Sequence, residues 1–496
     1  MTGQRLVNFL IFAAFFMETA GTIGPRSCAP KDCDLTTFPE DFKFGTASSA
    51  YQIEGGWNED GKGESWWDWY LNEYTNDNGN VASDSYHRYL DDIEALKEIG
   101  VDYYRFSISW TRILPKGHRA EVNQAGIDYY NNFLDGLKEA GIEPMVTMFH
   151  WDTPYALTYL GDWSNRKIVD DFVDYAELLF QLFGDRVKLW CTINEPRSFC
   201  QDVPATVHSL HLTHIPLGTY EYLCGHHALL AHAYTYRLYQ DKYKYSQGGK
   251  LGIVLNFDEN IPYSNTTENI KAAERANKFD IGWFADPLVF GDYPQIMKDV
   301  VAQNSAQQNF TTSRLPSFTT NEKNIVRGSF DIMFLNHYTA QLVKMAEQNL
   351  TTSWTHDKQI DSFKSASWPT TNIGFAIHPP ALRGVLTHMK ETYNNPTLWI
   401  SENGMSDTGG TSDKARIEFI QSMLEQVRLA MCEDGVKVLG YTYWSFLDSF
   451  EWNSLYRAKF GLVEVNFTTY DRTLKESAYY YKNLLQTHLI NASSSD

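Results

Sequence analysis

The stretch IVDDFVDYAELLFQLFGDRVKLWCTINEP, residues 168–196, contains one complete copy of the unit that decides the fold. Apolar residues within 168–183 recur at helical spacing, and Gly184 is a residue type that commonly ends a helix. The apolar run 187–193 then predicts a buried strand, and Glu195 follows its end. A helix that leads directly into a buried strand is the repeating unit of proteins with a parallel sheet.

The same unit recurs along the chain. Further helices are expected at residues 87–99 and 127–140, each followed by a glycine. The expected strands are residues 42–46, 101–107, 144–148, 187–193, 252–256, 332–335, 398–401 and 438–443. Eight such units favour the α/β class and a closed (β/α)₈ TIM barrel. An open doubly wound sheet is the alternative, but the sequence lacks the Gly-rich phosphate loop typical of that fold.

No shift in composition marks a second domain. The segments 311–324 and 348–372 are rich in Ser, Thr and Asn, which predicts long loop insertions on a single barrel domain.

The chain has 496 residues, 43% hydrophobic and 21% charged, as expected for a folded globular protein. Its net charge of −19 argues against nucleic acid or an anionic membrane as a partner, because either would require a basic surface.

The N-terminus is typical of a secretory signal. Arg5 precedes the apolar run 6–17, which is shorter than the roughly 20 residues that a membrane-spanning helix needs. A membrane anchor is the alternative interpretation. We predict a signal peptide at 1–20, an N-terminal extension at 21–37 and a catalytic barrel at 38–490. No later run is apolar and long enough to span a bilayer, so a secreted protein with no membrane span after signal cleavage is expected.

Sequons and cysteines agree with secretion. Asn-X-Ser/Thr sequons occur at Asn265, Asn309, Asn349, Asn466 and Asn491. The six cysteines permit fifteen connectivities, among which the sequence does not choose. A local Cys28–Cys33 bridge is plausible, and a Cys200–Cys224 bridge would bracket an insertion. Cys191 lies within an expected strand, where a buried free thiol is the simplest interpretation.

Two glutamates follow expected barrel strands. Glu195 comes after the strand at 187–193, and Glu402 comes after the strand at 398–401. The carboxyl ends of barrel strands lie on one face, where barrel enzymes carry their active sites. Two carboxyl groups there suit cleavage of a glycosidic bond, because one protonates the leaving oxygen while the other attacks the sugar. The alternative is that both are unrelated surface glutamates.

Several motifs strengthen this interpretation. They are FKFGTA at 42–47, YRFSISW at 104–110, FHWD at 149–152, TINEP at 192–196, SENG at 401–404 and EW at 451–452. From about residue 42 to 480 the chain resembles family 1 of the glycoside hydrolases, the β-glucosidase family. The segment GGWNEDGKG at 55–63 resembles animal, and particularly insect, members of that family.

The resemblance implies a role for each site residue. Glu402 would be the nucleophile and Glu195 the acid/base. Arg105 and Tyr338 would contact the nucleophile, and Asn194 would bind the sugar 2-hydroxyl. Trp444 would stack against the sugar ring. The residues that would bind the other hydroxyls are Gln52, His150, Glu451 and Trp452. A guanidinium beside a nucleophile keeps it ionised, whereas burial and a nearby negative charge keep an acid protonated. We therefore predict retention of anomeric configuration, with the two carboxyl groups about 5–5.5 Å apart.

Some positions depart from the family pattern and leave the substrate open. Residues 202–211 replace a Gly-rich segment, and the basic residues Arg457 and Lys459 follow the EW motif. These basic residues suggest a phosphorylated sugar, which Glu451 would repel, or a glucosinolate, the substrate of insect-type thioglucosidases (myrosinases). A catalytically silent barrel that binds sugars or a partner, and a transglycosidase, are further alternatives. The sequence contains no metal-binding cluster or nucleotide motif, so we predict no metal and no cofactor.

Overall fold

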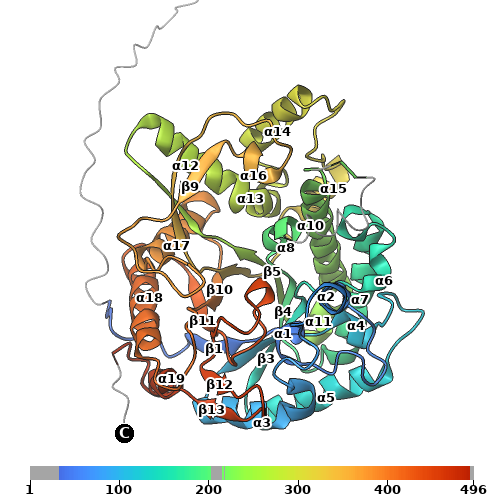
Figure 1. Cartoon of the computed structure of the whole chain (residues 1–496), viewed down its shortest axis with the longest axis vertical. Coiled ribbons are helices and arrows are strands. Elements are labelled where there is room, and N and C mark those ends of the chain that lie inside the picture. The colour runs from blue at the N-terminus through green and yellow to red at the C-terminus, as the bar shows by residue number, and fades with distance from the viewer. Residues whose placement is uncertain (1–32, 203–214, 217, 492–496) are drawn as a thin grey trace, which may run out of the picture.

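The structure, a computed structural model, describes residues 33–202, 215–216 and 218–491. Eight parallel strands close into a barrel in the order β1–β11–β10–β7–β5–β4–β3–β2 (Figure 1). The strands are β1 (Lys43–Ala47), β2 (Tyr103–Ser107), β3 (Glu143–Phe149), β4 (Leu189–Asn194), β5 (Lys250–Asn256), β7 (Met333–Asn336), β10 (Leu398–Asn403) and β11 (Val438–Trp444). The predicted TIM barrel is confirmed, and each of the eight expected strands lies within about two residues of its predicted ends.

Helices surround the barrel and bury the outer face of its strands (Figure 1). The helices expected from apolar spacing are α3 (Ser85–Ile99), α5 (Gln124–Glu139) and α7 (Lys167–Phe183). Helix α7 buries one apolar face and ends at Gly184, whose backbone N–H donates to the Phe180 carbonyl oxygen. The other long helices are α10 (Tyr220–Leu238), α12 (Thr267–Asp280), α13 (Gly282–Phe290), α14 (Gln295–Gln307), α17 (Pro380–Thr392), α18 (Lys414–Cys432) and α19 (Glu476–Thr487).

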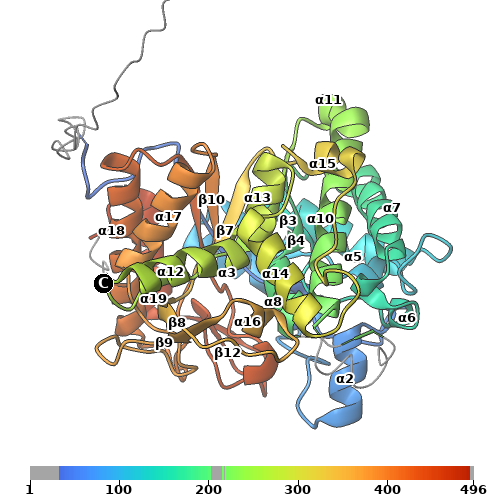
Figure 2. The same cartoon turned by 90° about the horizontal axis from the view of Figure 1, so that it is seen from above.

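Shorter elements lie in the connections between barrel strands and in the segment that follows the last barrel strand, β11. They are α1 (Ala50–Ile53), α2 (Trp66–Tyr74), α4 (Trp110–Ile113), α6 (Tyr155–Thr158), η1 (Asp162–Ser164), α8 (Pro196–Asp202), η2 (Tyr239–Tyr243), α11 (Lys244–Gln247), α15 (Thr320–Val326), α16 (Trp354–Asp357) and η3 (Trp452–Ser454), with strands β6 (Glu259–Pro262), β8 (Ala340–Met345), β9 (Ile360–Phe363), β12 (Val463–Val465) and β13 (Arg472–Leu474). Figure 2 shows α2, α16 and β9 on one side of the barrel, opposite α11 and α15. This side therefore carries the connections that follow the strand ends.

The two segments expected to be long loops contain regular structure, so that expectation is wrong in part. Helix α15 begins within 311–324, where Thr319 and Glu322 form a capping box. Helix α16 and strand β9 lie within 348–372, and β9 pairs with β8. The T-x-x-E pattern predicts a helix start, but the polar composition around it obscured the signal.

The disulfides correct one prediction and confirm another. Cys33 is bonded to Cys432 at the end of α18, so the Cys28–Cys33 bridge is wrong. Cys200 is bonded to Cys224, as expected, and Cys191 is a buried free thiol. The first bridge closes a sequence separation of 399 residues, which no local spacing can indicate.

The signal peptide predicted at 1–20 lies outside the described residues and stays a prediction. All five sequon asparagines are exposed. Within residues 33–202, 215–216 and 218–491, every helix is too short or too polar to cross a membrane.

Candidate active site

The carboxyl ends of the barrel strands surround a pocket of about 500 Å³. Asn194 ends β4, and Glu195 turns the chain into α8 with a positive φ of 44°. Glu402 is the second-last residue of strand β10, where it pairs in register with Asn336 of β7. Because only β5 and β7 separate β4 from β10 in the barrel, both glutamates face the same pocket.

The pocket is lined by aromatic and polar side chains from many connections. Of the predicted site residues, the lining includes His150, Asn194, Glu195, Tyr338, Glu402, Trp444, Glu451 and Trp452. Gln52 and Arg105 lie behind this lining, and each is at most 1% exposed. A concave site with aromatic surfaces and convergent polar groups is suited to a small polar ligand with an apolar face.

Two donors hold the Glu402 carboxylate from opposite sides. Arg105 Nη1 lies 2.5 Å from Oε1, and the Tyr338 hydroxyl donates to Oε2 at 2.7 Å. Arg105 also donates to Asn194 Oδ1 at 2.6 Å, so one guanidinium connects β2, β4 and β10. Since Glu402 is 3% exposed, water does not screen this ion pair appreciably. The two donors hold the carboxyl group of Glu402 in a fixed orientation.

The surroundings of Glu195 favour a protonated carboxyl group. Asn336 Nδ2 donates to Oε1 at 2.7 Å, and Ser198 Oγ lies 2.8 Å from Oε2. Burial, followed by the negative charge of Glu402, raises the pKa of Glu195 to about 7. The hydrogen bonds from Asn336 and Ser198 and the charge of Arg197 oppose this rise. A carboxyl group with such a pKa can donate and accept a proton near neutral pH.

A third carboxyl group, Glu451, lies in the connection after β11. Gln52 Nε2 donates to its Oε2 at 3.0 Å and to the backbone oxygen of Phe450 at 2.8 Å. The indole of Trp444 also forms a hydrogen bond to Glu451. Burial and the charge of Glu402 raise the pKa of Glu451 to about 8. Gln52 therefore does not line the pocket itself but holds the side chain of Glu451, which does.

Aromatic rings form one side of the pocket. The His150 ring is stacked between Trp444 and Trp452, with centroid distances of 5.6 Å and 6.0 Å. Asn194 Nδ2 lies 3.2 Å from His150 Nε2, so Nε2 accepts and Nδ1 carries the hydrogen. His150 Nδ1 is buried and has no hydrogen-bond partner in the structure.

Asn336 and Ser198 also contact Glu195, although the sequence motifs implied no role for either residue. Asn336 ends β7 as Asn194 ends β4, so its position at a strand end was the available signal. Ser198 follows Glu195 by three residues and lies in the first turn of α8, where its hydroxyl reaches back to the Glu195 carboxyl group. Their contacts with Glu195 depend on the order of the strands in the barrel and on the turn at Glu195. The local sequence predicts neither of these features.

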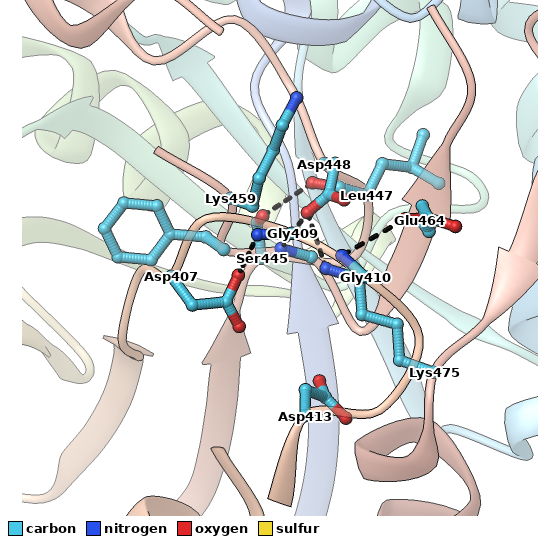
Figure 3. Close-up of polar contacts among 12 residues, drawn as sticks. Asp407, Gly409, Gly410, Asp413, Ser445, Leu447, Asp448, Lys459, Glu464 and Lys475 are labelled. Atoms are coloured by element: carbon cyan, nitrogen blue, oxygen red, sulfur yellow. Dashed lines mark hydrogen bonds and ion pairs between the residues drawn. The ribbon is translucent and has the colours of Figure 1, made fainter. Parts of the chain in front are cut away.

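The basic residues Arg457 and Lys459 do not line the pocket. Lys459 Nζ lies 4.1 Å from the centroid of the Phe467 ring, and its backbone exchanges two hydrogen bonds with Asp407 (Figure 3). Arg457 is exposed and donates to two backbone oxygens of its own loop. These positions give no support to a sulfate or phosphate site formed by the two residues.

A buried ion pair supports the loop that carries Glu451. Lys475 Nζ lies 2.9 Å from Asp448 Oδ1 (Figure 3), and both side chains are at most 1% exposed. The same oxygen accepts the backbone N–H of Gly461 at 2.9 Å. Because Asp448 precedes Glu451 by three residues, this pair fixes the backbone at the start of the loop.

Comparison with known proteins identifies the family. The model of the family described as glycosyl hydrolase family 1 matches residues 35–490. The chain belongs to glycosyl hydrolase family 1. It is therefore a glycoside hydrolase of the β-glycosidase type, as the sequence motifs indicated. Within the described residues, no group of three or more His, Cys, Asp or Glu side chains is placed to hold a metal ion.

Similar proteins include both β-glucosidases and a myrosinase. The chain is 41% identical to Myrosinase 1 of Brevicoryne brassicae, over 91% of this chain and 98% of that protein. It is 39% identical to Beta-glucosidase 40 of Arabidopsis thaliana, over 93% and 95% of the two chains. The solved aphid myrosinase superposes with a TM-score of 0.86 at 41% identity, covering 91% of this chain and 100% of that chain. A rice β-glucosidase mutant, solved in a covalent complex with glucose, has a TM-score of 0.84 at 39% identity and coverages of 90% and 99%.

Proposed function

We propose that the enzyme is a secreted retaining β-glucosidase in which Glu402 is the nucleophile and Glu195 the acid/base. The observation that carries this proposal is the contrast between two buried carboxyl groups in one pocket. Arg105 and Tyr338 donate to both oxygens of Glu402, whereas Glu195 has amide and hydroxyl partners and a pKa raised to about 7. Such a division suits a double-displacement reaction.

In the first half of the reaction, Glu402 attacks the anomeric carbon while Glu195 donates its proton to the leaving oxygen. The glucosyl ester that forms removes the negative charge of Glu402. The pKa of Glu195 then falls, because that charge is one of the two causes that raise it. In the second half, Glu195 accepts a proton from water, and the water attacks the ester with retention of configuration.

The remaining pocket residues are suited to binding the sugar. His150 and Asn194 line the pocket, and Asn194 accepts a hydrogen bond from Arg105. Glu451 presents a carboxyl group that Gln52 holds in place. Trp444 and Trp452 provide apolar surfaces for the C–H groups of the ring. In this proposal Gln52 acts by positioning Glu451.

The proposal is tested with a series of aryl β-glucosides whose leaving groups differ in acidity. Glu402→Gln is expected to abolish turnover of every substrate. Glu195→Gln is expected to slow substrates with poor leaving groups far more than activated ones, because an activated leaving group needs no proton. Glu64→Gln, a change outside the lining of the pocket, is the matched control and should retain turnover. Unchanged turnover in the Glu402 variant would reject the proposed mechanism.

An insect-type thioglucosidase is the second candidate, favoured by the 41% identity to the Brevicoryne brassicae protein named Myrosinase 1. A glucosinolate carries a sulfate, which needs a cation near the aglycone. Among the described residues that line the pocket, Arg197 is the one with a Lys or Arg side chain, and it is paired with Asp258 and Asp280. Comparing kcat/KM for a glucosinolate and an aryl β-glucoside decides between the candidates. A clear preference for the glucosinolate would replace the first proposal with the second.

Secretion rests on the N-terminal sequence, the exposed sequons and the disulfides. The Cys33–Cys432 and Cys200–Cys224 bridges are typical of oxidising compartments. Expression of the full chain in insect cells should deliver enzyme that begins near residue 21 to the medium. Enzyme retained in the cells with residues 1–20 intact would contradict this part of the proposal.

A further inference from the structure

The two carboxyl oxygens of Glu195 face different kinds of partner. Asn336 Nδ2 donates to Oε1 at 2.7 Å, and the orientation of this amide is fixed because Ser401 Oγ donates to Asn336 Oδ1 at 2.7 Å. An oxygen that already accepts an N–H is a poor place for the carboxyl hydrogen. The acidic hydrogen of Glu195 is therefore expected on Oε2, the oxygen that faces Ser198.

Ser198 lies between two acceptors. Its Oγ is 2.8 Å from Glu195 Oε2 and 3.0 Å from the amide oxygen of Asn256. Arg197 Nε is 3.0 Å from that same Asn256 atom. Because a guanidinium only donates, the Asn256 atom facing Arg197 must be the oxygen. Ser198 thus has a single hydrogen for two oxygens whenever Glu195 is ionised.

The Asn256 acceptor is held in place from behind. Arg197 is paired with Asp258 at 3.4 Å and with Asp280 at 3.5 Å, and Asp280 is fully buried. These pairs fix the guanidinium, which in turn fixes the amide oxygen of Asn256. The acceptor on this side of Ser198 is therefore rigid, and the hydroxyl hydrogen is the part of the network that can turn.

We propose that Ser198 is a positioning residue that turns its hydroxyl hydrogen between Asn256 and Glu195 as Glu195 changes protonation state. This inference rests on the proposed role of Glu195 as the acid/base. When Oε2 carries the proton, it donates to Ser198 Oγ, and Ser198 donates to Asn256. When the proton has passed to the leaving oxygen, Ser198 donates to the Oε2 carboxylate. When water returns a proton to Oε2, Ser198 turns back, and it loses no proton at any step.

Other charges also act on Glu195, so the test must separate them from Ser198. Glu402 on β10 and Glu451 in the connection after β11 are the acidic groups that interact with it. The Tyr338 hydroxyl and the Arg197 guanidinium are the other titratable groups in its surroundings. A substitution at Asn256 also touches Arg197, whose charge lowers the pKa of Glu195. The experiment therefore compares one substitution in two backgrounds.

The test is Asn256→Leu, measured as the pH dependence of kcat/KM for an aryl β-glucoside. Loss of the Asn256 acceptor leaves the Ser198 hydrogen available to the Glu195 carboxylate at all times. Because a hydrogen bond to a charged group is about twice as strong as a neutral one, the alkaline limb should move to lower pH by about 0.5–1 unit. In the Ser198→Ala background the same substitution should leave the limb unmoved, and in Ser198→Thr the shift should return.

Equal shifts in the Ser198 and Ser198→Ala backgrounds would assign the effect to the Arg197 charge and overturn the proposal. Absence of a shift in both would overturn it as well, because Ser198 would then only fill space. If Asn256→Leu does not fold, as judged by circular dichroism, Asn256→Ala serves in its place with the same expected outcomes. Glu195→Gln must lack the alkaline limb. If Glu195→Gln keeps the alkaline limb, Glu195 is not the acid/base and the proposed function itself is wrong. This result distinguishes failure of the proposed function from failure of the proposed role of Ser198.

Discussion

Esterifying Glu402 with a 2-deoxy-2-fluoroglucosyl group should lower the pKa of Glu195 by about 1–2 units. In the free enzyme this pKa is raised from its ordinary 4.5 to about 7, by burial first and by the Glu402 charge second. Two unit charges about 5.25 Å apart at an effective dielectric constant of about 20 repel by about 3 kcal/mol, or about 2 pKa units. Because burial is the larger cause, the pKa in the ester should stay above 4.5.

The assay is a ¹³C NMR titration of enzyme labelled at the glutamate carboxyl carbon. The Glu195 signal is assigned by its loss in Glu195→Gln. Glu402→Gln is the matched control, because it removes the same charge without placing a sugar in the pocket, and it should give a similar fall. A Glu195 pKa that stays near 7 in both the ester and the Glu402 variant would refute the electrostatic coupling on which the proton cycle depends.

Three further outcomes are expected, for the donor to Glu195, for a buried ion pair and for removal of metal ions. Asn336→Ala removes the donor to Glu195 Oε1. This substitution should lower kcat/KM about tenfold for alkyl β-glucosides and less for activated aryl β-glucosides. An equal loss for both kinds of substrate would contradict a positioning role for Asn336. Lys475→Met leaves Asp448 buried without its partner and should lower the free energy of unfolding, measured in urea, by about 3–5 kcal/mol. The control is Lys414→Met at an exposed position, where a loss below about 1 kcal/mol is expected. A loss that small for Lys475→Met would contradict the importance of the buried pair. Treatment with a chelator should leave the hydrolysis rate unchanged, and a loss restored by adding divalent metal would show that a metal takes part.

Much of the fold was predictable because each unit of the barrel is encoded locally. Residues 168–183 carry a helical apolar face, Gly184 ends it, and the following apolar run is long enough for one strand. The Cys33–Cys432 bridge was not predictable, because its partners meet only after the barrel has closed. Helix α15 was missed because its polar composition outweighed its capping box.

The same distinction applies to the site. Glu195 and Glu402 were predictable because each follows a strand within a specific motif. The contact of Asn336 with Glu195 was not, because β5 and β7 must first be placed between β4 and β10. The position of Gln52 behind Glu451 likewise depends on how the connection after β11 packs against α1. Local sequence thus predicts which groups reach the strand ends, and tertiary structure decides which of them touch.

In the proposed mechanism, Glu402 forms the covalent bond to the sugar while Glu195 moves the proton. The most direct measurement is mass spectrometry of peptides from enzyme inactivated with a 2-deoxy-2-fluoro-β-glucoside that has an activated leaving group. The account predicts one fluoroglucosyl group per chain, attached to the side chain of Glu402. A label on Glu195 or on any other side chain, or turnover that proceeds without a trapped ester, would contradict it.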